Sequence, residues 1–126
     1  VATFTTAPSG SFYIVVKHRN ALETWSANPV AVGASPSTYD FTTAASQAYG
    51  DNMKMLESGV YGFYSGDLNQ DGFIESLDFP SLFNDSDNLS EGYFATDLNG
   101  DGFVEGLDFP FLFNNIDAFI ELLRPY

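Results

Sequence analysis

Two twelve-residue stretches of this chain carry oxygen-bearing groups at spacings that suit a hard metal ion. Calcium takes about six to eight oxygen ligands, and a loop supplies them from positions 1, 3, 5, 7, 9 and 12. In the first stretch the candidate ligands are Asp67, Asn69, Asp71, the carbonyl of Phe73, Glu75 (directly or through water) and Asp78. In the second stretch they are Asp97, Asn99, Asp101, the carbonyl of Phe103, Glu105 and Asp108. The spacing predicts two calcium ions, held by residues 67–78 and 97–108.

The positions between these ligands have the residue types that such a loop needs. Gly72 and Gly102 stand at position 6, where the chain turns sharply in a backbone conformation that suits glycine. Ile74 and Val104 stand at position 8 and are apolar and β-branched. We expect the two loops to pair with each other there, through a short antiparallel bridge.

Each loop is predicted to lead directly into a helix. Asp78 and Asp108 occupy positions where a helix N-cap belongs, and Pro80 and Pro110 follow in the first turn. Apolar residues then recur at i, i+3 and i+4, which predicts one buried face on each helix. These residues are Phe79, Leu82 and Phe83 in the first helix and Phe109, Leu112 and Phe113 in the second.

The loop and helix form a unit that occurs twice, with its second copy 30 positions after the first. The alternative, that Asp, Asn and Gly merely populate turns, is less favoured because every ligand position is filled in both copies. Eight of the 17 acidic residues lie in the two loops, and two calcium ions would bring the net charge from −13 to −9. We therefore expect a chelator to loosen this half of the chain.

The residues before the repeat have the pattern of strands and turns, so the predicted fold class is α+β. We expect a β-rich, sandwich-like region over residues 1–64 and the calcium-loop region over residues 65–126. Short alternating or β-branched runs predict strands at residues 3–6, 12–16, 22–26, 37–42 and 59–64. So few strands cannot cover both faces of a sandwich. Further strands would precede Val1 in a longer precursor, or a neighbouring subunit would supply them.

The composition argues against several classes of function. A net charge of −13 disfavours nucleic acid and anionic membrane as partners, and no apolar run is long enough for membrane insertion. With one histidine and no cysteine, nucleophilic catalysis is not expected, so we predict that the protein is not an enzyme. Lys17, His18 and Arg19 form the one basic cluster. They either meet an acidic surface, on the same or another subunit, or face water.

The two loops resemble those of dockerins, the duplicated calcium-loop modules of secreted bacterial proteins. Both match the dockerin pattern Asp-x-Asn-x-Asp-Gly-x-Ile/Val-x-x-x-Asp, with Asp at position 12 where most EF-hands have Glu. The resemblance covers about residues 65–120 and implies calcium ligation. In cellulosomal dockerins positions 10 and 11 often carry a Ser/Thr pair that recognises cohesin; here they are Ser76-Leu77 and Gly106-Leu107. Residues 13–20 are similar to a segment found before dockerin-like repeats in surface and secreted proteins of Bacteroidota-like bacteria.

Two functions follow as expectations, both extracellular or at the bacterial cell surface. The preferred one is a calcium-stabilised structural protein whose partners are copies of itself. In that case it forms a homo-oligomer, fibre or surface layer in which residues 1–6 complete a neighbour's sheet. The alternative is a dockerin-type docking module, which binds another protein and anchors a secreted protein to a cell-surface or cellulosome-like complex.

Overall fold

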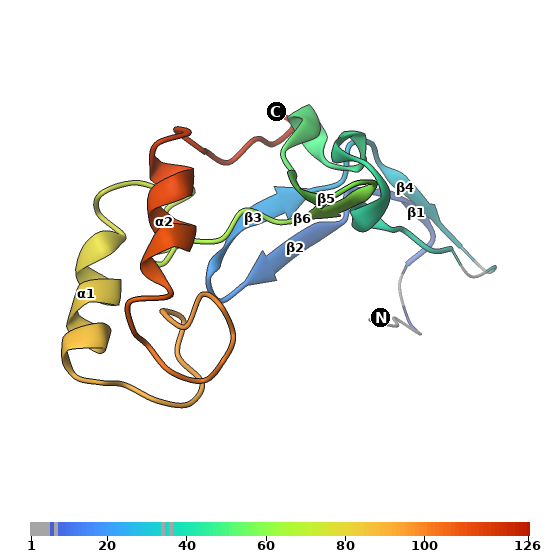
Figure 1. The fold of residues 1–126 in the computed structure, drawn as a ribbon. Coiled ribbons are helices and arrows are strands. Elements are labelled where there is room, and N and C mark those ends of the chain that lie inside the picture. Colours follow the sequence, from blue (N-terminus) through green and yellow to red (C-terminus); the bar gives the residue numbers. More distant parts are fainter. Residues whose placement is uncertain (1–5, 7, 34, 36) are drawn as a thin grey trace.

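The chain has a mixed α+β structure in which two helices lie side by side at one end and short strand pairs extend from them (Figure 1). The computed structural model describes residues 6, 8–33, 35 and 37–126. The β-rich half precedes both helices in the sequence, as expected. The chain then returns after the second helix, so that its C-terminus lies beside the β-rich half (Figure 1).

The strands of the described residues form three separate antiparallel pairs. The pairs are β1 (Gly10–Phe12) with β4 (Val30–Val32), β2 (Val15–His18) with β3 (Ala21–Trp25), and β5 (Lys54–Glu57) with β6 (Val60–Gly62). Two packed sheets are not seen among these residues, so the expected β-sandwich is not confirmed. The strand expected at residues 3–6 falls, except for Thr6, outside the described residues.

The strand expected at residues 37–42 is wrong. Its end turns into a 3-10 helix, Phe41–Thr43, because the Asp40 carboxylate accepts hydrogen bonds from the backbone N–H and the hydroxyl of Thr42. This local capping competes with strand pairing and favours a turn. Two further 3-10 turns follow, Ala45–Gln47 and Tyr49–Asp51.

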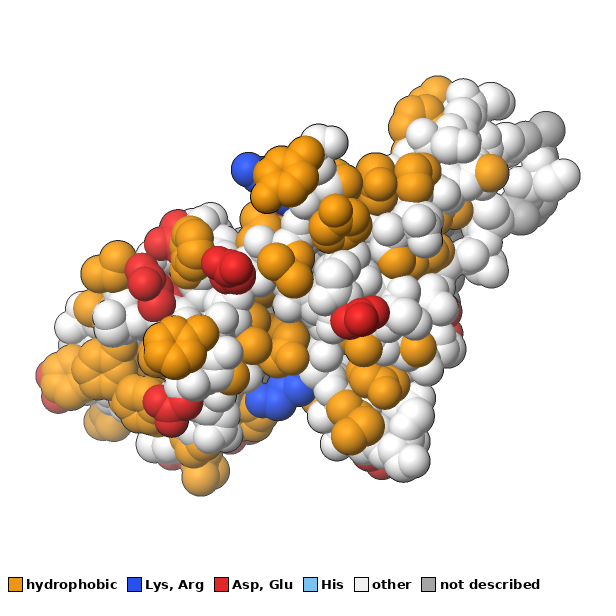
Figure 2. Space-filling view, turned by 90° about the horizontal axis from the view of Figure 1, so that it is seen from above, with side chains coloured by type: hydrophobic (Ala, Val, Ile, Leu, Met, Phe, Trp, Pro, Cys, Tyr) orange, Lys and Arg blue, Asp and Glu red, His pale blue; other side chains and the backbone are white. Residues whose placement is uncertain are grey.

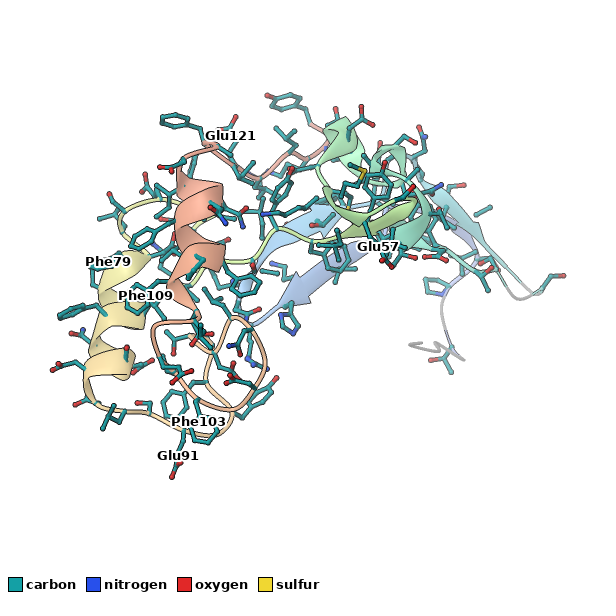
Figure 3. The ribbon with its side chains drawn as sticks, in the orientation of Figure 1. Glu57, Phe79, Glu91, Phe103, Phe109 and Glu121 are labelled. Atoms are coloured by element: carbon teal, nitrogen blue, oxygen red, sulfur yellow. The ribbon has the colours of Figure 1, made fainter. Side chains whose placement is uncertain are left out.

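Two short helices follow the two loops, as predicted. They are α1 (Phe79–Asp87) and α2 (Phe109–Ile116), with Pro80 and Pro110 in their first turns. Leu82 and Leu112 are fully buried. Phe79 and Phe109 lie between the helices with ring centroids 5.9 Å apart (Figure 3). None of the described helices is long and apolar enough to cross a membrane.

The main hydrophobic core is continuous across residue 64. Leu22, from β3, is buried in the same cluster as Ile74, Leu82 and Leu112. The backbone is also joined there, because Leu22 N–H donates to the Tyr64 carbonyl over 2.8 Å. The β2–β3 hairpin therefore packs with the repeat. A domain boundary at residue 64 remains a prediction, although the secondary structure does change close to that residue.

Candidate metal centre

Each loop is held in a tight turn by its own polar side chains. At position 3, Asn69 Oδ1 accepts from Asp71 N over 2.9 Å, and at position 5, Asp71 Oδ1 accepts from Phe73 N over 3.0 Å. The second loop repeats both bonds, at 2.8 Å and 2.9 Å. The repeat in sequence thus gives a repeat in local structure. These hydrogen bonds orient the side chains at positions 3 and 5 of each loop.

The carboxylate at position 12 closes each loop from the inside. Asp78 is fully buried, and its Oδ1 accepts from Leu68 N over 2.7 Å and Asn69 N over 3.1 Å. Its Oδ2 accepts from Glu75 N over 2.9 Å. Asp108 makes the same three bonds in the second loop. Both residues stand at the helix N-caps, as expected, but neither side chain makes a capping hydrogen bond to its helix. The carboxylate oxygens accept from backbone N–H groups of the loop instead.

The expected bridge between the two loops is wrong. Phe73, in the first loop, pairs with Glu121. Phe103, in the second loop, pairs with Glu91 (Figure 3). The position-8 amides follow the same pattern, since Ile74 N donates to the Ile120 carbonyl over 3.0 Å. Each loop therefore pairs with the segment that follows the helix of the other repeat. The two repeats are interlocked, and each stabilises the loop of the other.

The position-1 carboxylates are the most buried of the acidic ligands after position 12. Asp67 is 2% exposed, and its Oδ2 accepts from Gly72 N over 3.3 Å. Its Oδ1 is buried and has no hydrogen-bond partner. Burial, followed by the charge of Asp78, raises the pKa of Asp67 to about 6. A buried carboxylate oxygen without a donor is costly, and a cation bound to it would remove that cost.

The other predicted ligands lie nearer the surface. Asn69, Asp71, Asn99, Asp101 and Glu105 are exposed, and Glu75 is half-buried. Across residues 6, 8–33, 35 and 37–126, no three Asp, Glu or His side chains converge as a metal-binding group. The carboxylates are directed to loop amides instead. The donor set itself is all oxygen and acidic, which fits a hard cation such as calcium. With the orphaned Asp67 Oδ1, it makes residues 67–78 and 97–108 the candidate metal centre.

The basic cluster provides a contact that the loop motif does not contain. Arg19 Nε donates to the Phe94 carbonyl over 2.8 Å, and its guanidinium lies 4.0 Å from the centre of the Tyr93 ring. Asn20 Nδ2 donates to the Asp97 carbonyl over 3.1 Å. The sequence left open whether this cluster meets an acidic surface or faces water. Arg19 meets an acidic surface, since it contacts the second loop of the same chain. Lys17 pairs with Glu23 at 2.6 Å.

The repeat is similar to a known protein family. A family model described as the dockerin type I domain matches residues 65–117. No curated protein and no solved structure matches the chain. Dockerin domains are non-catalytic modules that bind calcium and dock onto cohesin domains, and they occur in secreted and cell-surface proteins. The chain therefore carries a dockerin-like, tandem calcium-loop module at residues 65–117, preceded by a β-rich segment that packs against it.

Proposed function

We propose that this chain is an extracellular docking module that binds two calcium ions and presents a protein-binding surface on the repeat. The ions would be held by the oxygen donors of residues 67–78 and 97–108. The match of residues 65–117 to the dockerin type I model is the observation that carries the proposal. The buried, unpartnered Asp67 Oδ1 supports the metal part of it.

Large apolar side chains are exposed at equivalent positions of both repeats. Leu77 and Leu107, at loop position 11, are 63% and 62% exposed. The other exposed pairs are Phe73 with Phe103 and Phe83 with Phe113. Figure 2 shows hydrophobic side chains on the surface at the end that carries the helices, with Asp and Glu among them. Exposed apolar groups of this size on a rigid support suit a protein interface.

Position 11 links this surface to the metal. Leu77 and Leu107 directly precede Asp78 and Asp108, whose buried carboxylates close the loops. A cation that orders the loops would fix the direction of the two leucine side chains. Binding of the partner would then depend on calcium without any need for the partner to contact the ion.

The proposal can be tested by biolayer interferometry against a panel of immobilised cohesin domains, in calcium and in chelator. We expect binding in calcium alone. Replacing both Leu77 and Leu107 by Asp should weaken it at least about tenfold, the loss expected when hot-spot residues are changed. Leu56→Asp is the matched control, because Leu56 is also 63% exposed but lies on β5. Binding that survives chelation, or that Leu56→Asp weakens equally, would contradict the proposal.

Docking is the function we propose because the dockerin match supports it. The self-assembling alternative, preferred from the sequence, depends on residues 1–6, which fall almost wholly outside the described residues. Light scattering and negative-stain microscopy of the chain in calcium test the alternative directly. A docking module should remain monomeric. Filaments that vanish on deletion of residues 1–6 would instead support the structural role.

A further inference from the structure

The turn of the β2–β3 hairpin, Arg19 and Asn20, is inserted between the two loops. Asn20 is 6% exposed and contacts both sides. Its carbonyl accepts from Gly66 N over 2.7 Å, directly before the first loop, and its Nδ2 donates to the carbonyl of Asp97, the first residue of the second loop. The hairpin therefore connects segments that the repeat itself leaves apart.

The two loops differ at position 4. The residue at that position binds the position-1 carbonyl in the first loop, whereas the hairpin binds it in the second. In the first loop Gln70 Nε2 donates to the Asp67 carbonyl over 2.5 Å, so the position-1 carbonyl is bound from within the loop. In the second loop position 4 is Gly100, which has no side chain to do this. The Asp97 carbonyl receives its hydrogen bonds from Asn20 Nδ2 at 3.1 Å and Arg19 Nη2 at 3.5 Å.

Arg19 holds the segment that leads into the second loop. Besides its bond to the Phe94 carbonyl, its guanidinium packs over Tyr93, and Nη2 lies 3.9 Å from Asp97 Oδ2. These contacts fix residues 93–97 through a planar group with several donors, which a point charge would not replace. Asp97 is the position-1 ligand of the second loop, so its backbone position decides where its carboxylate lies.

We propose that Asn20 and Arg19 are positioning residues of the second calcium loop, which makes calcium binding at that loop depend on the docked hairpin. In the first loop Gln70 supplies the corresponding contact. The hairpin meets that loop only through the backbone carbonyls of Asn20 and Ala21, which accept from Gly66 N and Gln70 Nε2, so the Asn20 and Arg19 side chains are not needed there. The inference rests on the proposed calcium binding. It adds that the second site extends beyond the residues 65–117 that define the module.

The glycines at position 6 allow the two loops to be followed separately. Gly72 N donates to Asp67 Oδ2 and Gly102 N donates to Asp97 Oδ2, so each amide senses the carboxylate of its own loop. Their signals in a ¹H–¹⁵N spectrum, recorded during a calcium titration, give a midpoint for each loop. In Asn20→Ala we expect the Gly102 midpoint to move to about tenfold higher calcium or more, as for other residues that orient metal ligands. The Gly72 midpoint should change less than about threefold.

Two further variants separate positioning from charge. Asn20→Asp adds a negative charge near the site, which would tighten calcium binding by electrostatics alone. It also sets a carboxylate oxygen against the Asp97 carbonyl, so positioning predicts weaker binding at the second loop. Arg19→Lys keeps the charge but lacks the guanidinium fork, and should also weaken the second loop. Lys17→Ala is the control, since it removes a positive charge from the same hairpin without contacting Asp97.

The outcomes are distinct. Selective movement of the Gly102 midpoint in Asn20→Ala, Asn20→Asp and Arg19→Lys supports the inference. An unchanged Gly102 midpoint, tighter binding in Asn20→Asp, or equal weakening of both loops overturns it while leaving calcium binding intact. If neither glycine responds to calcium in the unmodified chain, the proposed function fails and this inference fails with it.

Discussion

Replacing Asp108 by Asn should destabilise the protein even when no metal is bound. The side chain is fully buried, and its two oxygens accept three backbone hydrogen bonds. Oδ1 accepts from Leu98 N at 2.7 Å and Asn99 N at 3.0 Å, and Oδ2 accepts from Glu105 N at 2.9 Å. An amide has one acceptor oxygen. If that oxygen keeps the first two bonds, the NH₂ group faces the Glu105 N–H, and two donors oppose each other.

The size of the effect follows from that geometry. The variant loses one charge-assisted hydrogen bond and leaves a partly buried N–H without an acceptor, which together cost about 3 kcal/mol. The two remaining bonds are weakened as well, because their acceptor is no longer charged. For a chain of this length we expect the melting temperature to fall by roughly 10 °C.

Asp101→Asn is the matched control within the same loop. Asp101 is also a predicted calcium ligand, but it is exposed, and an Asn side chain can still accept from Phe103 N. Both variants should weaken calcium binding, whereas Asp108→Asn alone should lower stability in metal-free buffer. Urea unfolding followed by near-ultraviolet circular dichroism measures this, with sucrose added to favour the folded metal-free chain. Equal stability of the two variants without metal would refute the structural role of Asp108.

Two further predictions concern a buried carboxylate of the first loop and a buried leucine of the second helix. Because the pKa of Asp67 is raised to about 6, the folded metal-free chain binds its proton more tightly than the unfolded chain does. Its melting temperature should therefore fall as the pH rises from about 4 to above 6, and Asp67→Asn should flatten this profile. Leu112→Ala should lower the free energy of unfolding by about 2–5 kcal/mol, since Leu112 is fully buried. Leu56→Ala, at an exposed position, should change it little in the same urea titration.

The sequence predicted best those features that depend on residues close together in the chain. Every candidate ligand lies within twelve positions of the others in its loop, and both helices begin directly after their loops, as the pattern indicated. The family match covers this same part of the chain. The ligand assignments themselves remain predictions, since the described carboxylates contact loop amides.

The errors arose where groups far apart in the chain compete for the same partner. Asp78 and Asp108 do stand at helix N-caps, but their carboxylates accept from amides ten positions earlier and not from the first turn of the helix. Phe73 pairs with Glu121, which is 48 positions away. A periodic pattern contains no information about which of several possible partners lies closest once the core has formed. Short strands are affected most, because pairing and packing with distant residues decide whether they form.

The hairpin shows why the duplicated motif cannot by itself define the functional unit. The two loops agree at every ligand position, so a motif treats them as equivalent sites. They differ at position 4, where Gln70 binds the first loop internally and Gly100 cannot bind the second. The missing contact is supplied by Asn20, and the same hairpin adds Leu22 to the core that contains Leu82 and Leu112 of the two helices. A fragment that begins at residue 65 would keep all twelve candidate ligands and lose both of these groups. The sequence contains the difference between Gln70 and Gly100, but only the fold brings Asn20, 77 positions before Asp97, to the carbonyl that Gly100 leaves without a partner from its own loop.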